Sequence, residues 1–181
     1  MTDMTFTPST IEMSSAQVTI GGTDIGTVIG GITFTYTVGT QKVFGDQSSM
    51  PLTHFIIQEE AQLVVNFAEY SYDNLQLILP CATYVLDSGL TKKKIGVGGA
   101  QIASTDYVEI IANPVIGGSG TIDTDTNLRI TIFKAIPISN FEAGFTKDGV
   151  RVIAVTYDAI RDSTQTAGQQ LFLLGDSTAA A

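Results

Sequence analysis

Hydrophobic and polar residues alternate along most of the chain, and the most informative alternation lies in residues 60–67. Positions of one parity are apolar there, and most of the others are polar. The apolar positions are Ala61, Leu63, Val65 and Phe67. A period of two is typical of a strand with one buried face. The segment therefore predicts a long strand, which begins near Pro51.

The pattern changes from a strand to a helix after Tyr70. Ser71 can cap the first turn, and Asp73 lies where the helix dipole favours an anion. Apolar residues then recur at spacings of three and four, and Pro80 ends the run because the residue before a proline avoids the α region. The apolar positions are Leu75, Ile78 and Leu79. We expect one short helix at this place and strands or turns elsewhere.

The cleanest alternation covers residues 32–38. Three threonines, Thr33, Thr35 and Thr37, share one face, and large apolar side chains share the other. The apolar face consists of Ile32, Phe34, Tyr36 and Val38, and we expect it to point to the core. Further strands are predicted at residues 17–20, 27–29, 82–86, 107–111, 128–135, 150–159 and 170–174, with breaks at Gly30-Gly31 and at the Asp148-Gly149 hairpin signal.

Residues 39–50 lack a clear period and predict a long loop. Gly45-Asp46 and Ser48-Ser49 are typical of turns, and a loop of this length in a compact domain is usually functional or disordered. Val43 and Phe44 are apolar residues in its middle. They favour a loop that docks on another molecule, and the alternative is a loop that folds back on its own domain.

Length and composition fit one β domain. The 181 residues can build one sizeable core, and the strand signals predict a mainly β fold, an antiparallel β-barrel or two-sheet sandwich with one short flanking α-helix. We expect an N-terminal arm at residues 1–15, a single domain at 16–176 and a flexible tail at 177–181. Hydrophobic residues make up 44% and charged residues only 15%, which favours an oligomer that covers uncharged surface.

Charge and targeting signals narrow the function classes. A net charge of −9 argues against sequence-independent binding of nucleic-acid phosphates. No apolar run approaches the roughly 18 residues of a membrane-spanning helix. The N-terminus lacks the pattern of a secretion signal. We therefore expect a protein that is made in the cytoplasm and does not insert into a membrane.

The sequence offers little catalytic or metal-binding chemistry. His54 and Cys81 are the chain's single histidine and cysteine, and neither lies in a catalytic motif, so we expect a structural or solvent-facing histidine and a small buried cysteine. Residues 123–127 resemble the start of a calcium loop but lack its glycine and its closing acid. Glu59 and Glu60 point to opposite faces of a strand. We expect no enzyme, no metal and no cofactor. The Lys92-Lys93-Lys94 run has two equally good explanations. It is either a solvated surface segment or a contact with an acidic neighbouring subunit.

The order of these segments resembles the major tail tube proteins of long-tailed bacteriophages. The resemblance is spread over most of the chain and lies in order and spacing rather than in one motif. Its segments are residues 17–26, the strand 32–38 with the loop after it, residues 67–75, residues 133–135, residues 152–162 and residues 169–176. Inner tubes of contractile tails and of related injection machines belong to the same superfamily, and the sequence does not separate them.

The resemblance implies a structural virion protein of the phage tail, assembled in the host cytoplasm. Its subunits would form hexameric rings that stack into a tube, which conducts the genome without binding it specifically, next to tail terminator, tape measure and baseplate or tip proteins. The loop at 39–50 would stack the rings through Val43, Phe44, Gly45, Asp46 and Met50. We predict that Thr33, Thr35, Thr37 and Glu60 line the lumen. A carbohydrate-binding β-sandwich and a virion decoration or fibre protein are the alternatives.

Overall fold

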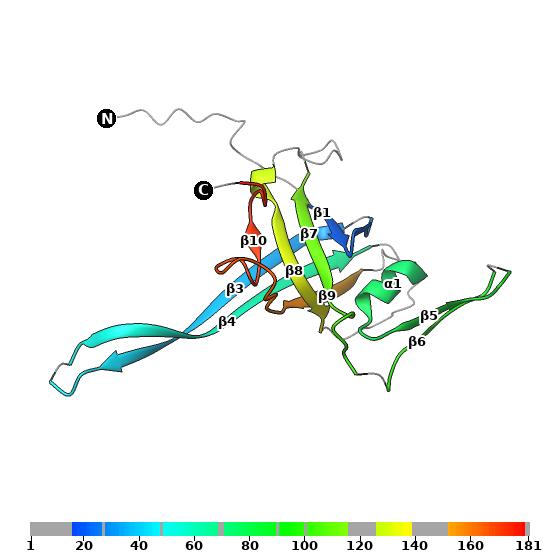
Figure 1. Ribbon diagram of the computed structural model, residues 1–181. Coiled ribbons are helices and arrows are strands. Elements are labelled where there is room, and N and C mark those ends of the chain that lie inside the picture. Colours follow the sequence, from blue (N-terminus) through cyan, green and yellow to red (C-terminus); the bar gives the residue numbers. More distant parts are fainter. Residues whose placement is uncertain are drawn as a thin grey trace, which may run out of the picture.

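A computed structural model describes residues 16–26, 28–47, 49–68, 71–89, 91–99, 101–115, 126–138 and 152–179. It shows a mainly β protein with two antiparallel sheets and one short α-helix, and no closed barrel is found among these residues (Figure 1). The predicted fold class is thereby confirmed, with the barrel alternative set aside. The expected arm at 1–15 and the Asp148-Gly149 hairpin lie outside the described residues.

The large sheet has the strand order β2-β1-β7-β8-β9-β4-β3, and β10 pairs with β8 beside this path. All of its strand pairs are antiparallel. The second sheet consists of β5 and β6 alone. The strand bounds are β1 (Ala16–Ile20), β2 (Thr23–Asp24), β3 (Val28–Phe44), β4 (Pro51–Phe67), β5 (Thr83–Leu86), β6 (Lys93–Gly96), β7 (Val108–Pro114), β8 (Ile130–Pro137), β9 (Ile153–Ala159) and β10 (Leu173–Leu174).

The core lies against one face of the large sheet and follows the predicted alternation of β4. Its apolar positions are at most 1% exposed, and they meet side chains of β1, β7, β8, β9 and the helix α1 (Tyr72–Ile78). They are Ala61, Leu63, Val65 and Phe67. Removal of this apolar surface from water is the main stabilising term of the fold.

The helix α1 begins where the sequence predicts. Ser71 is its N-cap, and the Ser71 hydroxyl oxygen accepts a hydrogen bond from the Asn74 backbone N–H at 3.0 Å. The Asn74 side-chain amide donates to the Ile25 carbonyl at 3.2 Å, and the Tyr157 hydroxyl donates to the Leu77 carbonyl at 3.4 Å. These bonds tie the helix to the sheet. Burial raises the pKa of the Tyr157 phenol above its usual range, so the hydroxyl stays protonated.

Two predicted interruptions of β3 are wrong. The expected break at Gly30-Gly31 is a bulge inside β3, where both glycines have a positive φ, near 80°, that other residues rarely adopt. The expected loop at 39–50 is strand as far as Phe44, and β4 starts at Pro51, so only residues 45–50 lie between the two strands. Valine, phenylalanine and threonine in this stretch favour strand, which explains why pairing continues beyond the body.

The last predicted strand is much shorter than expected. Residues 170–174 contribute only Leu173 and Leu174 to β10, and the preceding chain forms turns. Asp162 organises these turns, because its carboxylate accepts hydrogen bonds from the Thr164 N–H and hydroxyl and pairs with Lys134 Nζ at 3.1 Å. The bonds from Thr164 and Lys134 lower the pKa of Asp162 to about 2.

Candidate functional site: an exposed β arm and a polar sheet face

The most prominent surface feature is a two-stranded arm formed by the distal parts of β3 and β4. It leaves the body at one side and ends in the turn at residues 45–50 (Figure 1). Strand β9 accompanies β4 only from Gln62 to Phe67, so Pro51–Ala61 has β3 as its sheet neighbour. Strand β3 is the edge of the sheet. We define the arm as residues 38–60. Its free part spans about 20 Å from Val38 to Phe44 at roughly 3.3 Å per residue.

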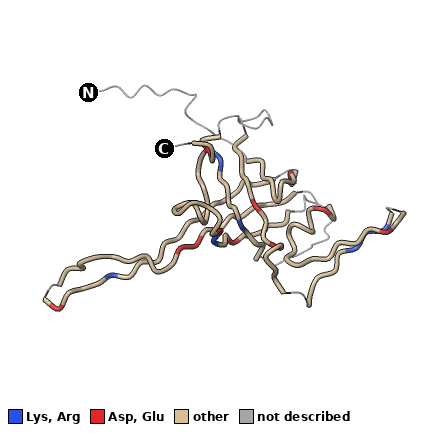
Figure 2. Tube along the Cα trace, viewed as in Figure 1, with Lys and Arg blue, Asp and Glu red and all other residues tan. Residues whose placement is uncertain are grey.

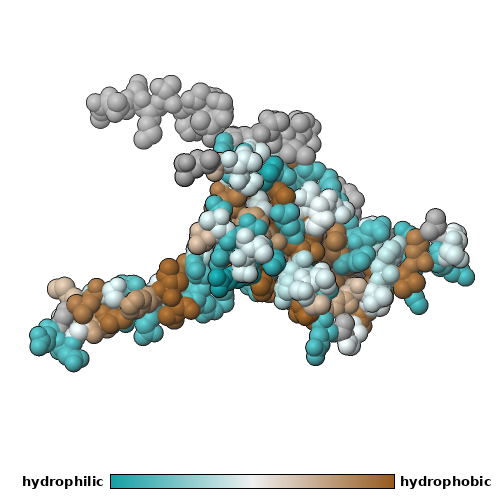
Figure 3. All heavy atoms as spheres, in the orientation of Figure 1, coloured by the Kyte–Doolittle hydropathy of each residue, from teal (hydrophilic) through white to brown (hydrophobic). Residues whose placement is uncertain are grey.

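Large apolar side chains of the arm are exposed to solvent. Phe44 is 55% exposed, Leu52 66%, Phe55 59% and Ile56 62%. Figure 3 shows brown surface along the arm. A monomer rarely leaves such a row uncovered, and a paired ribbon with open edges is a template for association.

The register places these apolar side chains on both faces of the arm. Thr40 pairs with Ile56 and Gln41 pairs with Phe55. Neighbouring residues of a strand point to opposite faces, so Ile56 and Phe55 lie on different sides. A bulge next to Gly39 accommodates Ile57 as an extra residue of β4. Both faces therefore offer apolar surface for contact.

The predicted stacking residues lie at the end of the arm. Val43 and Phe44 belong to β3, Gly45 and Asp46 to the turn, and Met50 precedes β4. A Cβ atom at Gly45 would lie only 2.9 Å from a Leu52 methyl carbon, so the side chain of Leu52 covers the turn. The structure brings these residues together on a strand-supported tip, in place of the expected loop.

The predicted lumen residues share one face of the sheet. Thr37 is the register partner of Glu60, and Thr33 and Thr35 are exposed on the same side of β3. Asp158 of β9 pairs with Gln62 and joins this face. On β3, β4 and β9 the described residues of this face include no lysine or arginine: Thr33, Thr35, Thr37, Glu60, Gln62, Val64, Asn66, Ala154, Thr156 and Asp158. We call this the threonine face.

The opposite, core-side face of β3 is only partly covered where the arm begins. Ile32 and Phe34 pack against the core as predicted, but Tyr36 and Val38 are 41% and 40% exposed. Phe172 holds the C-terminal segment here through edge contacts with Phe34 and Tyr36, with ring centroids 4.9 and 5.1 Å apart. The expectation that all four apolar residues take the core side holds for the first two, because the core ends where β3 leaves the body.

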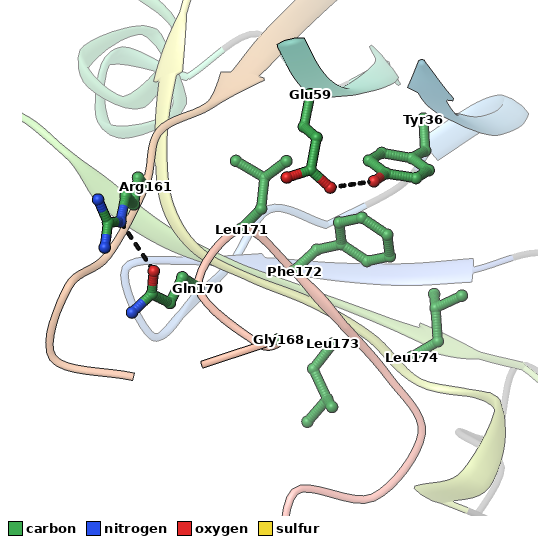
Figure 4. A pocket seen from close by; sticks show the side chains of 9 residues that line it. All are labelled: Tyr36, Glu59, Arg161, Gly168, Gln170, Leu171, Phe172, Leu173 and Leu174. Atoms are coloured by element: carbon green, nitrogen blue, oxygen red, sulfur yellow. Dashed lines mark hydrogen bonds between the residues drawn. The ribbon is translucent and has the colours of Figure 1, made fainter. Parts of the chain in front are cut away.

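An open groove lies between the arm base and the C-terminal segment (Figure 4). Its volume is about 650 Å³, and Leu171, Phe172, Leu173 and Leu174 supply apolar lining. The Tyr36 hydroxyl donates to the Glu59 carboxylate at one end, which raises the pKa of Tyr36. Arg161 Nε donates to Gln170 Oε1 at 2.8 Å at the other. These polar side chains are partnered within the groove.

The other chemical groups of the described residues do not converge on a reaction centre. His54 is exposed on the arm opposite Lys42, as expected for a solvent-facing histidine. Cys81 is half-buried rather than buried. It follows the helix at a positive φ of 56°, and its thiol donates to the Asp106 carboxylate at 3.6 Å. That contact and burial raise the pKa of the Cys81 thiol. The calcium-like residues 123–125 lie outside the described residues, and Thr126–Leu128 form one 3-10 turn, η2.

Metal-ligand clusters and membrane-spanning helices are both absent from the part of the chain that the structure describes. No cluster of three or more histidine, cysteine, aspartate or glutamate side chains is placed to hold a metal ion there. None of its helices has the length and apolar character needed to cross a bilayer. In comparisons with known proteins, no protein-family model matches the chain and no curated protein matches it.

Proposed function

We propose that this protein is the structural subunit of a tail tube of the bacteriophage type. Copies join into hexameric rings, and the rings stack into a tube through which the genome passes. The observation that carries the proposal is the arm, a two-stranded ribbon with open edges and exposed apolar side chains on both faces. Such a ribbon is costly to leave in water and becomes covered when copies assemble.

The threonine face supports the proposal independently of the arm. DNA carries about one negative charge per 1.7 Å of axis, and lysine or arginine on a wall would hold its phosphates. Glu60 and Asp158 are the charged residues of the threonine face as we define it, and the rest are uncharged. A wall of this kind repels the phosphates weakly and offers them no cationic partner, as passage without retention requires.

The composition agrees with extensive contacts between copies. Charged residues make up only 15% of the chain, so little of its surface is specialised for solvation. Strand β3 and the distal part of β4 also leave backbone N–H and C=O groups along open edges. Pairing of such edges between subunits satisfies these groups in a ring.

An arm-shortened variant tests the proposal. Residues 41–55 are replaced by Asn-Gly, because Thr40 and Ile56 are register partners and a two-residue turn can join them. The body should fold with the parent's melting temperature, since the buried core lies outside the replaced stretch. Sedimentation velocity should show large particles for the parent and none for the variant. A shortened protein that still assembles into the parent's particles would refute the role of the arm.

A further inference from the structure

A second projection lies on the side of the body opposite to the arm. It consists of β5, β6 and the turn between them, and we call residues 83–97 the basic hairpin (Figure 1). Asp87 stabilises the tip of the hairpin. The Asp87 carboxylate accepts hydrogen bonds from the Thr91 and Lys92 backbone N–H groups, both at 2.8 Å. These bonds lower the pKa of Asp87. The hairpin therefore presents a defined surface.

One face of the basic hairpin is covered and the other is open. Tyr84 pairs with Ile95, and both are half-buried, with Ile95 packed against the core. The next register pair, Val85 and Lys94, points to the other side, and both residues are exposed. Val97, just after β6, is 59% exposed. Figure 3 shows brown surface on this projection as well as on the arm. The hairpin thus combines apolar surface with positive charge.

The two projections have opposite charge. The basic hairpin contains three lysines and one aspartate, which gives a net charge of +2. The arm contains one lysine and three acids, Asp46, Glu59 and Glu60, which gives a net charge of −2. In Figure 2 both colours occur on each projection, with red prevailing on the arm and blue on the basic hairpin. Lys93 forms an ion pair with Asp73 at 4.0 Å, whereas Lys92 and Lys94 form no ion pair with the described residues.

We propose that the basic hairpin is the docking surface for the arm of the next copy of this chain. This inference rests on the proposed function, because it names the partner of the arm within the stack. Two surfaces on opposite sides of one subunit make a head-to-tail contact, and such contacts repeat without closing. Apolar side chains of the arm cover Val85 and Val97, and the Asp46 carboxylate at the arm tip complements Lys92 and Lys94, which sets the orientation.

Two complementary variants test this pairing. The arm-defective variant carries Phe44→Ser and Leu52→Ser, and the hairpin-defective variant carries Lys92→Glu and Lys94→Glu. All four side chains are exposed, so both variants should unfold at the parent's temperature. A third variant with Lys92→Arg and Lys94→Arg keeps the charge and should stack as the parent does.

Each defective variant alone should form the single unit, the ring, but no stack of rings. The reason is that one of the two surfaces is defective in every head-to-tail contact. An equimolar mixture restores one contact, between the intact arm of one variant and the intact hairpin of the other. Mass photometry should then show particles of twice the unit mass and no longer stacks. Hairpin-defective protein that stacks like the parent, or a mixture that shows only unit masses, would overturn the pairing while leaving the tube proposal standing. A parent that never stacks would overturn the proposed function itself.

Discussion

Single substitutions on the two faces of the arm measure how completely assembly covers it. Phe55 and Ile56 are neighbours on β4 but point to opposite sides, and they are 59% and 62% exposed. Burial of a whole side chain of this size is worth about 1.5–3 kcal/mol, so the exposed three fifths correspond to about 1–2 kcal/mol. We expect Phe55→Ser and Ile56→Ser each to weaken association by this amount per copy, about 5- to 30-fold in dissociation constant.

Sedimentation velocity over a concentration series provides the assay. The parent and both variants are compared with Leu174→Ser, because Leu174 is also 59% exposed but belongs to β10 and not to the arm. The free energy of unfolding in urea should differ from the parent by no more than about 0.5 kcal/mol for either arm variant. If one variant assembled at the parent's concentration, its face of the arm would remain in solvent, and the reasoning that both faces are covered would be refuted.

Three further predictions concern the body. Ser71→Ala removes the cap of α1 and should lower stability by about 0.5–2 kcal/mol in urea unfolding. Phe172→Ala removes the ring that joins the C-terminal segment to β3 and should cost about 2 kcal/mol, with faster proteolysis after residue 160; unchanged proteolysis would contradict the anchoring role. The pKa of Asp162, about 2 against an ordinary 3.8, stabilises the fold above pH 4, and this stabilisation is lost as the pH falls toward 2. Asp162→Asn should lower the melting temperature at pH 7 and flatten that acid dependence; an unchanged pH profile would contradict it.

The parts of the fold that could be predicted from sequence are those with one buried face. Leu63, Val65 and Phe67 alternate with polar residues because the core covers one side of β4. Ser71 marks the helix start because its side chain must satisfy a backbone N–H of the first turn. In both places a local physical requirement restricts the residue type.

The β3 half of the arm, residues 39–44, was not predicted as strand because neither face of the arm is buried in the subunit, whereas the β4 half belongs to the strand predicted from Pro51. Gln41, Lys42 and Val43 show no polar-apolar period, and the periodicity argument depends on such a period. Only the β propensity of Val43, Phe55 and Ile56 carried a signal for strand. Exposed apolar residues in this stretch are typical of a surface that becomes buried elsewhere.

The threonine face could be predicted in part. The alternation of Thr33, Thr35 and Thr37 placed them on one side, and their register with Glu60 is as expected. Asp158 was missed, because the pairing of β9 with β4 is a long-range contact that local pattern does not reveal. Its outward alternation between the buried Tyr157 and Ala159 was the available signal.

Electron cryomicroscopy of the purified protein tests the central claim most directly. We expect hexameric rings or stacked tubes in which the arm of each subunit contacts a neighbouring ring and the threonine face lines the lumen. Compact monomers at all salt and protein concentrations, with the arm in solvent, would contradict the account. So would an assembly in which Thr33, Thr35 and Thr37 lie on the outer surface.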